Sequence, residues 1–336
     1  MAKRKAPGAF QRIGVAGAGA WGIALANVCA RAGRDVVLWG RDGDAIGRLA
    51  ATRMSVRLPG VRLDRKIAVE AEVPALAGCG AVLLVAPAQA TRDLARKLEA
   101  ALPDSVALVT CAKGIERGAD RFMTEVLREA APRHGAAILS GPSFAADVAA
   151  GLPTAVALAS EDEALAEALA RALASPAFRV YHSSDARGVE IGGAAKNVLA
   201  IACGIAAGLA LGASANAALI ARGFAELSRF GEAYGAQPRT LAGLSGLGDL
   251  VLTCTSPQSR NFALGLSLGQ GRAVAEALAA GGLAEGAYTA RALIEMARAK
   301  GVEMPIAAGV DAVLSGALGV RAAVEALLAR PTRTEG

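Results

Sequence analysis

Three cationic side chains of this chain occur where a purely structural role would need no charge. Lys196 lies in the stretch EIGGAAKN, which opens a long apolar run rich in alanine and glycine. Lys113 directly follows an apolar run in CAKGIE, and Arg260 belongs to SPQSRN. An ammonium can donate a proton to a developing alkoxide, and a guanidinium can bind a phosphate through two hydrogen bonds. The residue types therefore indicate proton transfer on a small phosphorylated substrate.

Each of these charges also has an ordinary structural interpretation. A lysine at the start of an apolar helix commonly lays its stem on apolar neighbours and keeps its ammonium in water. Lys113 fits a solvated loop, because loops are where charge normally collects. The segment Gly243 to Asn261 would then be a polar connection between helices. It is longer than the roughly two to eight residues usual for such connections, which favours a functional role.

Two neighbours of these cations extend the predicted site. Asp249, in the segment before SPQSRN, could orient a lysine or accept a hydrogen bond from a hydroxyl. Asn197 follows Lys196 in the helix and points about 100° away from it, so we expect Asn197 to orient a neighbouring group.

A glycine-rich turn near the N-terminus carries a nucleotide-binding motif. Arg12 to Ala16 reads as a short buried strand, and the following GAGAWG at residues 17–22 opens a helix. This is GxGxxG in the strand, turn and helix context that dinucleotide binding requires. Gly17 permits the tight turn, Gly19 lets the backbone approach a pyrophosphate, and Gly22 allows close packing. The phosphates would lie at the helix N-terminus.

The next predicted strand, Asp35 to Trp39, ends where the choice between NAD and NADP is usually made. It is followed by Gly40, Arg41 and Asp42. Arg41 could bind a 2′-phosphate, which favours NADP slightly, whereas Asp42 could accept from the ribose 2′-hydroxyl of NAD. Both cofactors stay open, and ordinary solvated charges at a helix start are the structural alternative.

Apolar runs that alternate with helical patterns predict a parallel, doubly wound sheet in the first half of the chain. The expected strands are 12–16, 35–39, 67–70, 81–86, 106–112, 136–139, 154–160 and 178–182. In such sheets ligands lie beyond the carboxyl ends of the strands, where Lys113 and the turn SGPSF are expected. From about residue 185 the pattern is helical, with breaks at 231–238, 243–261, 281–286 and 301–305.

We therefore predict an α/β protein with two domains. A disordered leader at 1–10 would precede an N-terminal Rossmann-like domain at 11–188, with a doubly wound, mainly parallel sheet. An all-α substrate-binding domain would occupy 189–330.

Composition narrows the class of protein further. The 336 residues are 54% hydrophobic with a scattered net charge of +6, and zinc-finger spacing or RNA-binding aromatic motifs are absent. We expect phosphorylated small molecules as partners and no nucleic acid. Five dispersed cysteines and two histidines form neither a disulfide framework nor a metal-ligand cluster, so we expect no metal and a cytoplasmic location.

One uncharged segment, Val198 to Ala221, resembles a membrane span, because glycines recur at four-residue spacing from Gly204. Ser214, Asn216 and the lack of a Trp/Tyr belt favour instead a buried, close-packed helix of a soluble protein. We therefore expect no integral membrane segment. The oligomeric state stays open, with a homodimer as one expectation.

Taken together, the motifs resemble the NAD(P)-dependent glycerol-3-phosphate dehydrogenases of the bacterial type. The resemblance runs nearly end to end through GAGAWG, WGRD, RLPG, CAKGIE, SGPSFA, EIGGAAKNVLAI, ANAALIARGFAE, GLSGLGDLVLTCTSPQSRN, AEG and GVEMPI. EIGGAAKN and GLGDLVLTCTSPQSRN are specific to that family, whereas GxGxxG is shared by many. The resemblance implies an oxidoreductase that reversibly reduces dihydroxyacetone phosphate to sn-glycerol 3-phosphate with NAD(P)H and so feeds glycerophospholipid synthesis.

The resemblance also implies the residues of the site. On the family pattern Lys196 is the proton donor and acceptor, and Lys113 is a second catalytic residue. The substrate would be lined by Lys113, Gly141, Ser143, Lys196, Asp249, Ser259, Arg260 and Asn261. The cofactor would contact Gly17, Gly19, Ala20, Trp21, Gly22, Arg41, Lys113, Ala145, Arg260, Leu283 and Glu285.

One departure and two alternatives accompany this resemblance. Ala20 stands where the family commonly has a hydroxyl or amide side chain, so one phosphate contact is expected to be missing. Another two-domain dehydrogenase, of the 3-hydroxyacid or ketopantoate type, would share GxGxxG and a catalytic lysine but gives no reason for SPQSRN. A nucleotide-sensing regulator without chemistry would be expected to lose Lys196 or Lys113.

Overall fold

The computed structural model describes residues 10–280 and 282–331, so residues 1–9 of the predicted leader lie outside the described residues. The chain divides into two compact units. The first comprises the residues up to Glu116 together with Arg121–Glu190, and the second comprises Arg117–Asp120 and the residues from Ile191 onward. Phe10, the last residue of the predicted leader, is buried in the core of the first unit.

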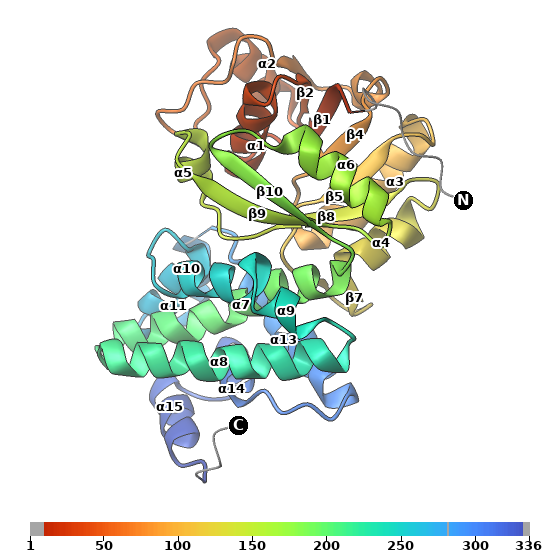
Figure 1. Ribbon diagram of the computed structural model, residues 1–336. Helices are drawn as coiled ribbons and strands as arrows, with labels where there is room; N and C mark the ends of the chain where they lie inside the picture. Colours follow the sequence, from red (N-terminus) through yellow and green to blue (C-terminus); the bar gives the residue numbers. More distant parts are fainter. Residues whose placement is uncertain (1–9, 281, 332–336) are drawn as a thin grey trace. The chain divides into compact units, whose positions relative to one another are not determined.

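The first unit is built on an eight-stranded sheet in the order β10-β9-β8-β5-β4-β1-β2-β3 (Figure 1). Its strands are Arg12–Ala16 (β1), Asp35–Trp39 (β2), Ala68–Glu70 (β3), Ala81–Leu84 (β4), Ala107–Thr110 (β5), Ala136–Ser140 (β8), Thr154–Ala159 (β9) and Phe178–Ser183 (β10). Neighbouring strands pair in parallel except β8 with β9. The predicted mainly parallel, doubly wound sheet is confirmed.

Helices cover both faces of this sheet. They are Ala20–Arg31 (α1), Gly43–Thr52 (α2), Thr91–Ala101 (α3), Met123–Ala130 (α4), Ala145–Ala149 (α5) and Glu163–Leu173 (α6). Buried residues of α1, α5 and α6 form one core on the sheet, and those of α3 and α4 form another on its opposite face (Figure 1). Strand β4 contributes Leu83 to the first core and Val82 to the second, which explains why the central strands read as continuous apolar runs.

The second unit is helical throughout its described residues, as predicted. Its helices are Ala186–Gly208 (α7), Ala213–Ala233 (α8), Pro238–Leu241 (α9), Asp249–Cys254 (α10), Arg260–Gly269 (α11), Val274–Ala280 (α12), Glu285–Ala299 (α13), Pro305–Leu314 (α14) and Val320–Leu328 (α15). A single π-helical turn, Leu244–Gly248, precedes α10. Helix α7 begins in the first unit and continues in the second.

The uncharged segment Val198 to Ala221 is not one helix, contrary to our expectation. Helix α7 ends at Gly208 and α8 begins at Ala213, because the link between them includes Ala210 and Gly212 with φ of 56° and 89°. By length and composition α7 would suffice to cross a membrane, with a mean hydropathy of 1.4 in its most apolar window. However, 89% of that window is buried inside the protein, as in the core helix of a soluble protein.

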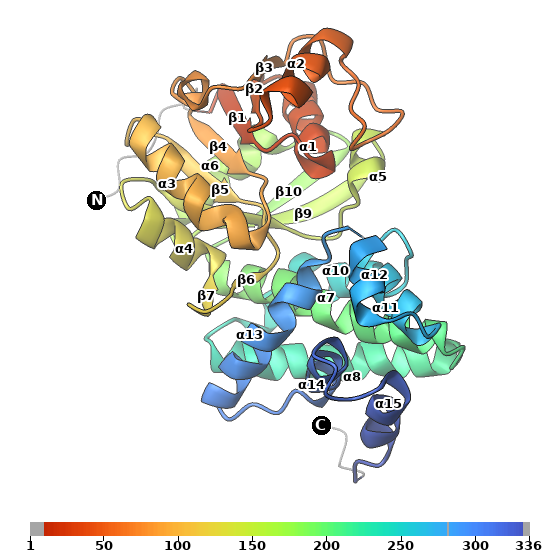
Figure 2. The same ribbon diagram turned by 180° about the vertical axis from the view of Figure 1, so that it is seen from behind.

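Helix α7 lies beside α11 (Figure 2), and Gly204 and Gly208 of α7 face it. A Cβ atom at Gly204 would lie 2.1 Å from the Phe262 carbonyl oxygen, and one at Gly208 would lie 2.4 Å from that of Leu266. Reciprocally, a Cβ atom at Gly265 would lie 2.0 Å from the Ile201 carbonyl oxygen. The spacing that resembles a membrane motif therefore serves close packing of two helix backbones inside the second unit.

The segment Gly243 to Asn261 is largely helical, so its interpretation as one long polar connection is wrong. It contains the π-helical turn and α10, and only a short stretch between α10 and α11 is non-helical. Leu250 and Cys254 are fully buried at helical spacing, which the glycines and polar residues around them obscure. The length of this segment therefore gives no support for a functional role.

The glycine-rich turn after β1 adopts the conformation that its residues predict. Gly17 has φ of +134°, and its N–H donates to the Trp39 carbonyl at 2.8 Å. A Cβ atom at Gly22 would lie 1.7 Å from the Gly17 carbonyl oxygen, which locks α1 against the turn. A Cβ atom at Gly19 would meet no atom within 4 Å. The middle glycine therefore faces open space, whereas the outer two are required by the fold.

We predict opposite stability effects for two alanine substitutions in this turn. Gly22→Ala should lower the thermal unfolding midpoint by several degrees, because overpacking against a backbone carbonyl costs about 1–3 kcal/mol. Gly19→Ala should leave the midpoint nearly unchanged, since Gly19 has an ordinary φ of −76° and no steric conflict. Unfolding followed by circular dichroism measures both, and equal losses would contradict the packing role of Gly22.

Candidate active site

In the first unit, Lys113 and the turn after β8 meet at one edge of the sheet. Strands β5 and β8 are parallel neighbours, so their carboxyl ends lie side by side. The Lys113 ammonium donates to the Gly141 carbonyl at 2.8 Å, and the Ser143 hydroxyl donates to the same oxygen at 3.0 Å. All three were predicted to line the substrate, and the fold brings them together.

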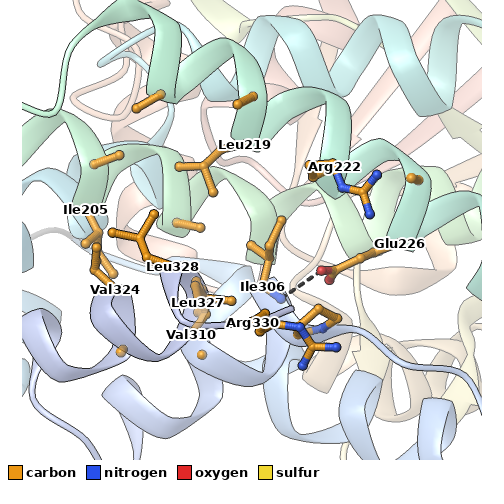
Figure 3. A pocket seen from close by; sticks show the side chains of 18 of the residues that line it. Ile205, Leu219, Arg222, Glu226, Ile306, Val310, Val324, Leu327, Leu328 and Arg330 are labelled. Atoms are coloured by element: carbon orange, nitrogen blue, oxygen red, sulfur yellow. Dashed lines mark hydrogen bonds between the residues drawn. The ribbon is translucent and has the colours of Figure 1, made fainter. Parts of the chain in front are cut away.

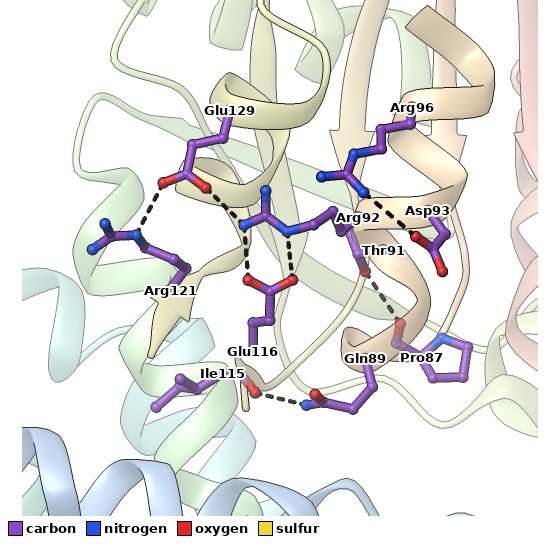
Figure 4. Close-up of polar contacts among 10 residues, drawn as sticks. All are labelled: Pro87, Gln89, Thr91, Arg92, Asp93, Arg96, Ile115, Glu116, Arg121 and Glu129. Atoms are coloured by element: carbon purple, nitrogen blue, oxygen red, sulfur yellow. Dashed lines mark hydrogen bonds and ion pairs between the residues drawn. The ribbon is translucent and has the colours of Figure 1, made fainter. Parts of the chain in front are cut away.

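A network of charged side chains holds in place the segment that follows Lys113. This chain forms a hairpin of two short strands, Ile115–Glu116 (β6) and Arg121–Phe122 (β7), which the sequence did not reveal. Arg92 on α3 binds both oxygens of Glu116 at 2.8 Å and also Glu129 on α4 at 2.7 Å (Figure 4). These hydrogen bonds raise the pKa of Arg92 further, so it stays a cation. The Gln89 amide donates to the Ile115 carbonyl at 2.8 Å.

The glycine-rich turn lies at the topological switch point of the sheet, where nucleotides bind in folds of this type. Strands β2 and β3 lie on one side of β1 in the sheet, and the strands that follow them in the sequence, β4 and β5, lie on the other side. Gly19 begins α1, which has no side-chain cap and no acidic residue in its first turn, so its N-terminus suits an anion. The open space beside Gly19 leaves room for a pyrophosphate next to the turn, and the other residues predicted to contact the cofactor there are Gly17, Ala20, Trp21 and Gly22.

Two other residues predicted to contact the cofactor also begin or precede helices of the first unit. Arg41 is exposed just beyond β2, and the next residue, Asp42, caps α2 by accepting the Ala45 N–H at 3.0 Å. Ala145 is the first residue of α5 and is partly buried. The carboxylate of Asp42 is thus engaged in a structural role that Arg41 does not have.

In the second unit, Lys196 is buried in a cluster with two residues of α10. Its Nζ atom donates to Asp249 Oδ1 at 2.7 Å and to Thr253 Oγ1 at 2.7 Å. The Thr253 hydroxyl in turn donates to the same Asp249 oxygen at 3.2 Å. Lys196 is 5% exposed and Asp249 is 1% exposed, so the ammonium is compensated by a carboxylate inside the fold.

The glycines of EIGGAAKN explain how α7 comes close enough for this cluster. A Cβ atom at Gly192 would lie 2.5 Å from the Ser245 carbonyl oxygen and 2.8 Å from the Gly246 Cα atom. Helix α7 therefore packs directly on the backbone of the π-helical turn, one turn before Lys196 and immediately before Asp249. Any larger residue would push Lys196 and Asp249 apart.

Two buried thiols lie beside this cluster and do not take part in its chemistry. Cys254 follows Thr253 on α10 and is hydrogen bonded to Cys203 of α7. That bond and burial raise the pKa of Cys254 well above its usual range. Because the thiolate is the nucleophile, a protonated buried thiol gives no covalent catalysis.

Asn197 orients a neighbouring group, as its helical position predicts. The Asn261 amide donates to Asn197 Oδ1 at 2.9 Å, and Asn261 Oδ1 accepts the Gly286 N–H at 2.9 Å. These bonds join α7 to the first turns of α11 and α13. Gly286 is required there, since its Cβ atom would lie 2.5 Å from the Asn197 carbonyl oxygen.

The remaining predicted residues lie at the starts of the same two helices. Ser259 caps α11 by accepting the Phe262 N–H at 3.2 Å, and Arg260 is the exposed first residue of that helix. Leu283 is partly buried shortly before α13, and Glu285 is the first residue of α13. In this triplet Ser259 caps α11, Arg260 presents an exposed guanidinium, and the buried Asn261 links α7 to α13 through hydrogen bonds.

Sequence reasoning missed Thr253 and assigned no role to Glu190. Thr253 follows Asp249 by four residues, which puts both side chains on one face of a helix, but the segment was interpreted as a loop. The Glu190 carboxylate accepts the Thr124 N–H of α4 at 2.5 Å and is 3% exposed. Burial raises the pKa of Glu190 to about 7. Phe122 at the N-cap of α4 offers no side-chain acceptor, so Glu190 replaces it.

Comparison with known proteins agrees with this arrangement over nearly the whole chain. Residues 12–166 match the family model of the NAD-dependent glycerol-3-phosphate dehydrogenase N-terminus, and residues 185–325 match that of its C-terminus. A glycerol-3-phosphate dehydrogenase, NAD(P)+, from Azorhizobium caulinodans is 63% identical over 328 residues, which cover 97% of this chain and 99% of the relative.

Solved structures distinguish the family from its wider fold. The crystal structure of glycerol-3-phosphate dehydrogenase from Coxiella burnetii has a TM-score of 0.91 and 39% identity, covering 96% of this chain and 100% of that chain. A ketopantoate reductase from Ralstonia eutropha has a TM-score of 0.60 and 19% identity, covering 94% and 99%, and so shares the fold alone. The chain is therefore an oxidoreductase that uses NAD or NADP and belongs to the glycerol-3-phosphate dehydrogenase family.

Proposed function

We propose that this protein reversibly reduces dihydroxyacetone phosphate to sn-glycerol 3-phosphate, with Lys196 as the proton donor and acceptor. The observation that carries the proposal is the buried ammonium of Lys196, held at 2.7 Å by both Asp249 and Thr253. A buried lysine without a compensating partner would lose its proton, whereas a carboxylate at contact distance favours the charged form. Lys196 can therefore hold a proton out of bulk water until a substrate oxygen needs it.

The reaction adds two groups to the carbonyl of the substrate. When bound, the reduced nicotinamide supplies the hydride that reaches the carbonyl carbon. Lys196 donates its proton to the carbonyl oxygen as negative charge develops there, so the alkoxide is neutralised as it forms. Asp249 stabilises the ammonium before transfer, and in the reverse direction Lys196 accepts the hydroxyl proton. Lys113, with its cationic Nζ fixed on the Gly141 carbonyl, would assist by attracting the anionic substrate.

We predict that Lys196→Ala lowers kcat at least about 10²-fold, the low end for general acid–base catalysis, with little change in cofactor affinity. Because the substitution leaves Asp249 buried without its partner, the double variant Lys196→Met/Asp249→Asn should be made in parallel to keep the site neutral. Steady-state rates measure kcat, and fluorescence titration with NAD(P)H measures cofactor affinity. The exposed Lys300→Ala is the matched control, and near-wild-type turnover of both Lys196 variants would end the assignment.

The phosphate of the substrate is assigned to Arg260. Its guanidinium is exposed at the first residue of α11, where the helix N-terminus adds favourable charge for an anion. Ser259 fixes this helix start as its cap, and Asn261 ties it to α7 and α13. The planar guanidinium suits a phosphate because it forms two parallel hydrogen bonds.

We predict that Arg260→Ala raises KM for dihydroxyacetone phosphate about tenfold or more, since hydrogen bonds between charged groups are among the strong ones. The kcat/KM for unphosphorylated dihydroxyacetone should fall much less, because that substrate has no phosphate to lose contact with. Arg298→Ala removes an exposed arginine of α13 and serves as the control. Equal losses for both substrates would contradict a phosphate-binding role.

For the cofactor we propose a modest preference for NADPH. The support is the division of roles after β2, where Asp42 caps α2 and the Arg41 guanidinium is exposed. A 2′-phosphate would gain charge-assisted hydrogen bonds from Arg41, whereas the 2′-hydroxyl of NADH would gain less.

A steady-state assay with dihydroxyacetone phosphate and each reduced cofactor tests both the activity and this preference. Wild type should oxidise both cofactors, with the lower KM for NADPH. Arg41→Ala should raise KM for NADPH several-fold and leave KM for NADH nearly unchanged, because only NADPH carries the 2′-phosphate. Tight cofactor binding without any oxidation would favour a regulator over an enzyme. An unchanged KM for NADPH in Arg41→Ala would remove Arg41 from the cofactor site.

We also propose a cytoplasmic location and a role in supplying glycerol 3-phosphate for glycerophospholipid synthesis. The five cysteines support the location, since all are free and buried. The pathway follows from the proposed product, which carries the backbone and phosphate that such lipids contain.

A further inference from the structure

The second unit contains a half-open cavity of about 960 Å³, lined mainly by α7, α8, α14 and α15 (Figure 3). Its walls are mainly apolar, and Figure 3 shows Ile205, Leu219, Val310, Val324 and Leu328 around it. A volume of this size and an apolar lining with a few polar groups are typical of small-molecule sites. Lys196, Asp249 and Thr253 do not line it, so it is distinct from the proposed active site.

The lining residues of α8 change character along the helix. These residues form a stripe along α8. Its N-terminal part is apolar, with Ala215 and Leu219, and its C-terminal part is charged, with Arg222, Glu226 and Arg229. Spacings of three and four residues put these side chains on one face. From Ala215 to Arg229 the stripe is about 21 Å long at the rise of an α-helix. The cavity therefore has an apolar end and a charged end.

The charged end has an excess of arginine. Glu226 is 2% exposed, and its carboxylate accepts the N–H groups of Ile306 at 2.8 Å and of Ala307 at 3.2 Å, so it is committed to the start of α14 (Figure 3). Arg330 pairs with Glu303 at 3.1 Å, and Arg229 donates to the Glu303 carbonyl at 3.1 Å. Arg222 makes no ion pair with any residue in the ranges 10–280 and 282–331.

We propose that this cavity binds an amphipathic anion, a molecule with one saturated hydrocarbon chain and a single carboxylate or phosphate head group. The chain would lie along Ala215 and Leu219 of α8 and the apolar residues of α14 and α15, which removes its surface from water. The head group would lie at Arg222, whose guanidinium makes no ion pair with a residue that the structure describes. A cationic head group is disfavoured there, because three arginines face it and both nearby carboxylates are engaged.

Isothermal titration calorimetry on the full-length protein tests this directly, with dodecanoate and dodecyl phosphate each kept below its micelle concentration. Both should bind with a stoichiometry near one per chain and raise the thermal midpoint, because a ligand specific for the folded state stabilises it. Dodecyltrimethylammonium has the same chain and the opposite charge, and it should bind at least about tenfold more weakly. Comparing the two anions identifies which head group is preferred.

Two variants test the two ends of the cavity separately. Gly309→Leu adds a side chain to α14 at a position where a Cβ atom meets only Leu327 at 3.7 Å, so it should fill the apolar end and weaken both anions about tenfold or more. Arg222→Glu should weaken the anions to a similar extent and reduce the discrimination against the cation. Arg298→Glu makes the same change of charge at a residue outside the cavity, so this variant should bind both anions as the wild type does.

Several outcomes would overturn the proposal. These are equal binding of anion and cation, unchanged binding by both cavity variants, and a fall in the thermal midpoint with every amphiphile, which is the behaviour of a detergent. Sedimentation velocity provides a further criterion. If the chain self-associates and Gly309→Leu abolishes that association, a second copy occupies the cavity. All of these are measurements of binding, so their failure leaves the proposed reduction of dihydroxyacetone phosphate untouched.

Discussion

The buried ion pair between Lys196 and Asp249 is the interaction on which the second unit depends. An ammonium and a carboxylate that are almost fully excluded from water cost several kcal/mol each to desolvate, so neither can be there without the other. Their approach requires α7 to lie against the backbone that precedes α10, which Gly192 permits. The same helix is tied to α11 and α13 through Asn197 and Asn261. One short stretch thus sets both the position of the proposed proton donor and the packing of the helices around it.

The sequence is informative where one physical requirement acts on a few adjacent residues. The turn at Gly17, Gly19 and Gly22 was predictable because each glycine answers a local need, and the lysine of EIGGAAKN was visible as a charge in apolar surroundings. The role of Thr253 was not predictable, because its partner Lys196 lies far away in the sequence and its helix has only six residues. The hairpin after Lys113 was hidden for a similar reason, since its strands are two residues each and are held by long-range contacts from Arg92.

Two buried glutamates solve the same problem in different units. Helix α4 has Phe122 at its N-cap, and α14 has Met304 there, so neither helix can satisfy its first N–H groups with its own cap. Glu190 reaches α4 and Glu226 reaches α14, each from another helix. Burial raises the pKa of both carboxyls to about 7, so each helix contact includes a group that gains or loses a proton near neutrality. Helix capping here is a tertiary interaction, which a local pattern cannot reveal.

The contact between α7 and α11 has a consequence for how this protein can change. Glycines at 204 and 208 oppose backbone atoms of α11, and Gly265 opposes the backbone of α7, so main chain meets main chain at these positions. The glycines have no side chain to order at these contacts, so the entropic cost of the contacts is smaller than that of contacts between long side chains. Because the atoms opposite each glycine belong to the backbone, no smaller residue can be substituted there to make room for a larger one. A substitution at one of these glycines therefore has no compensating substitution across the interface, and this pair of helices can diverge only away from these contacts.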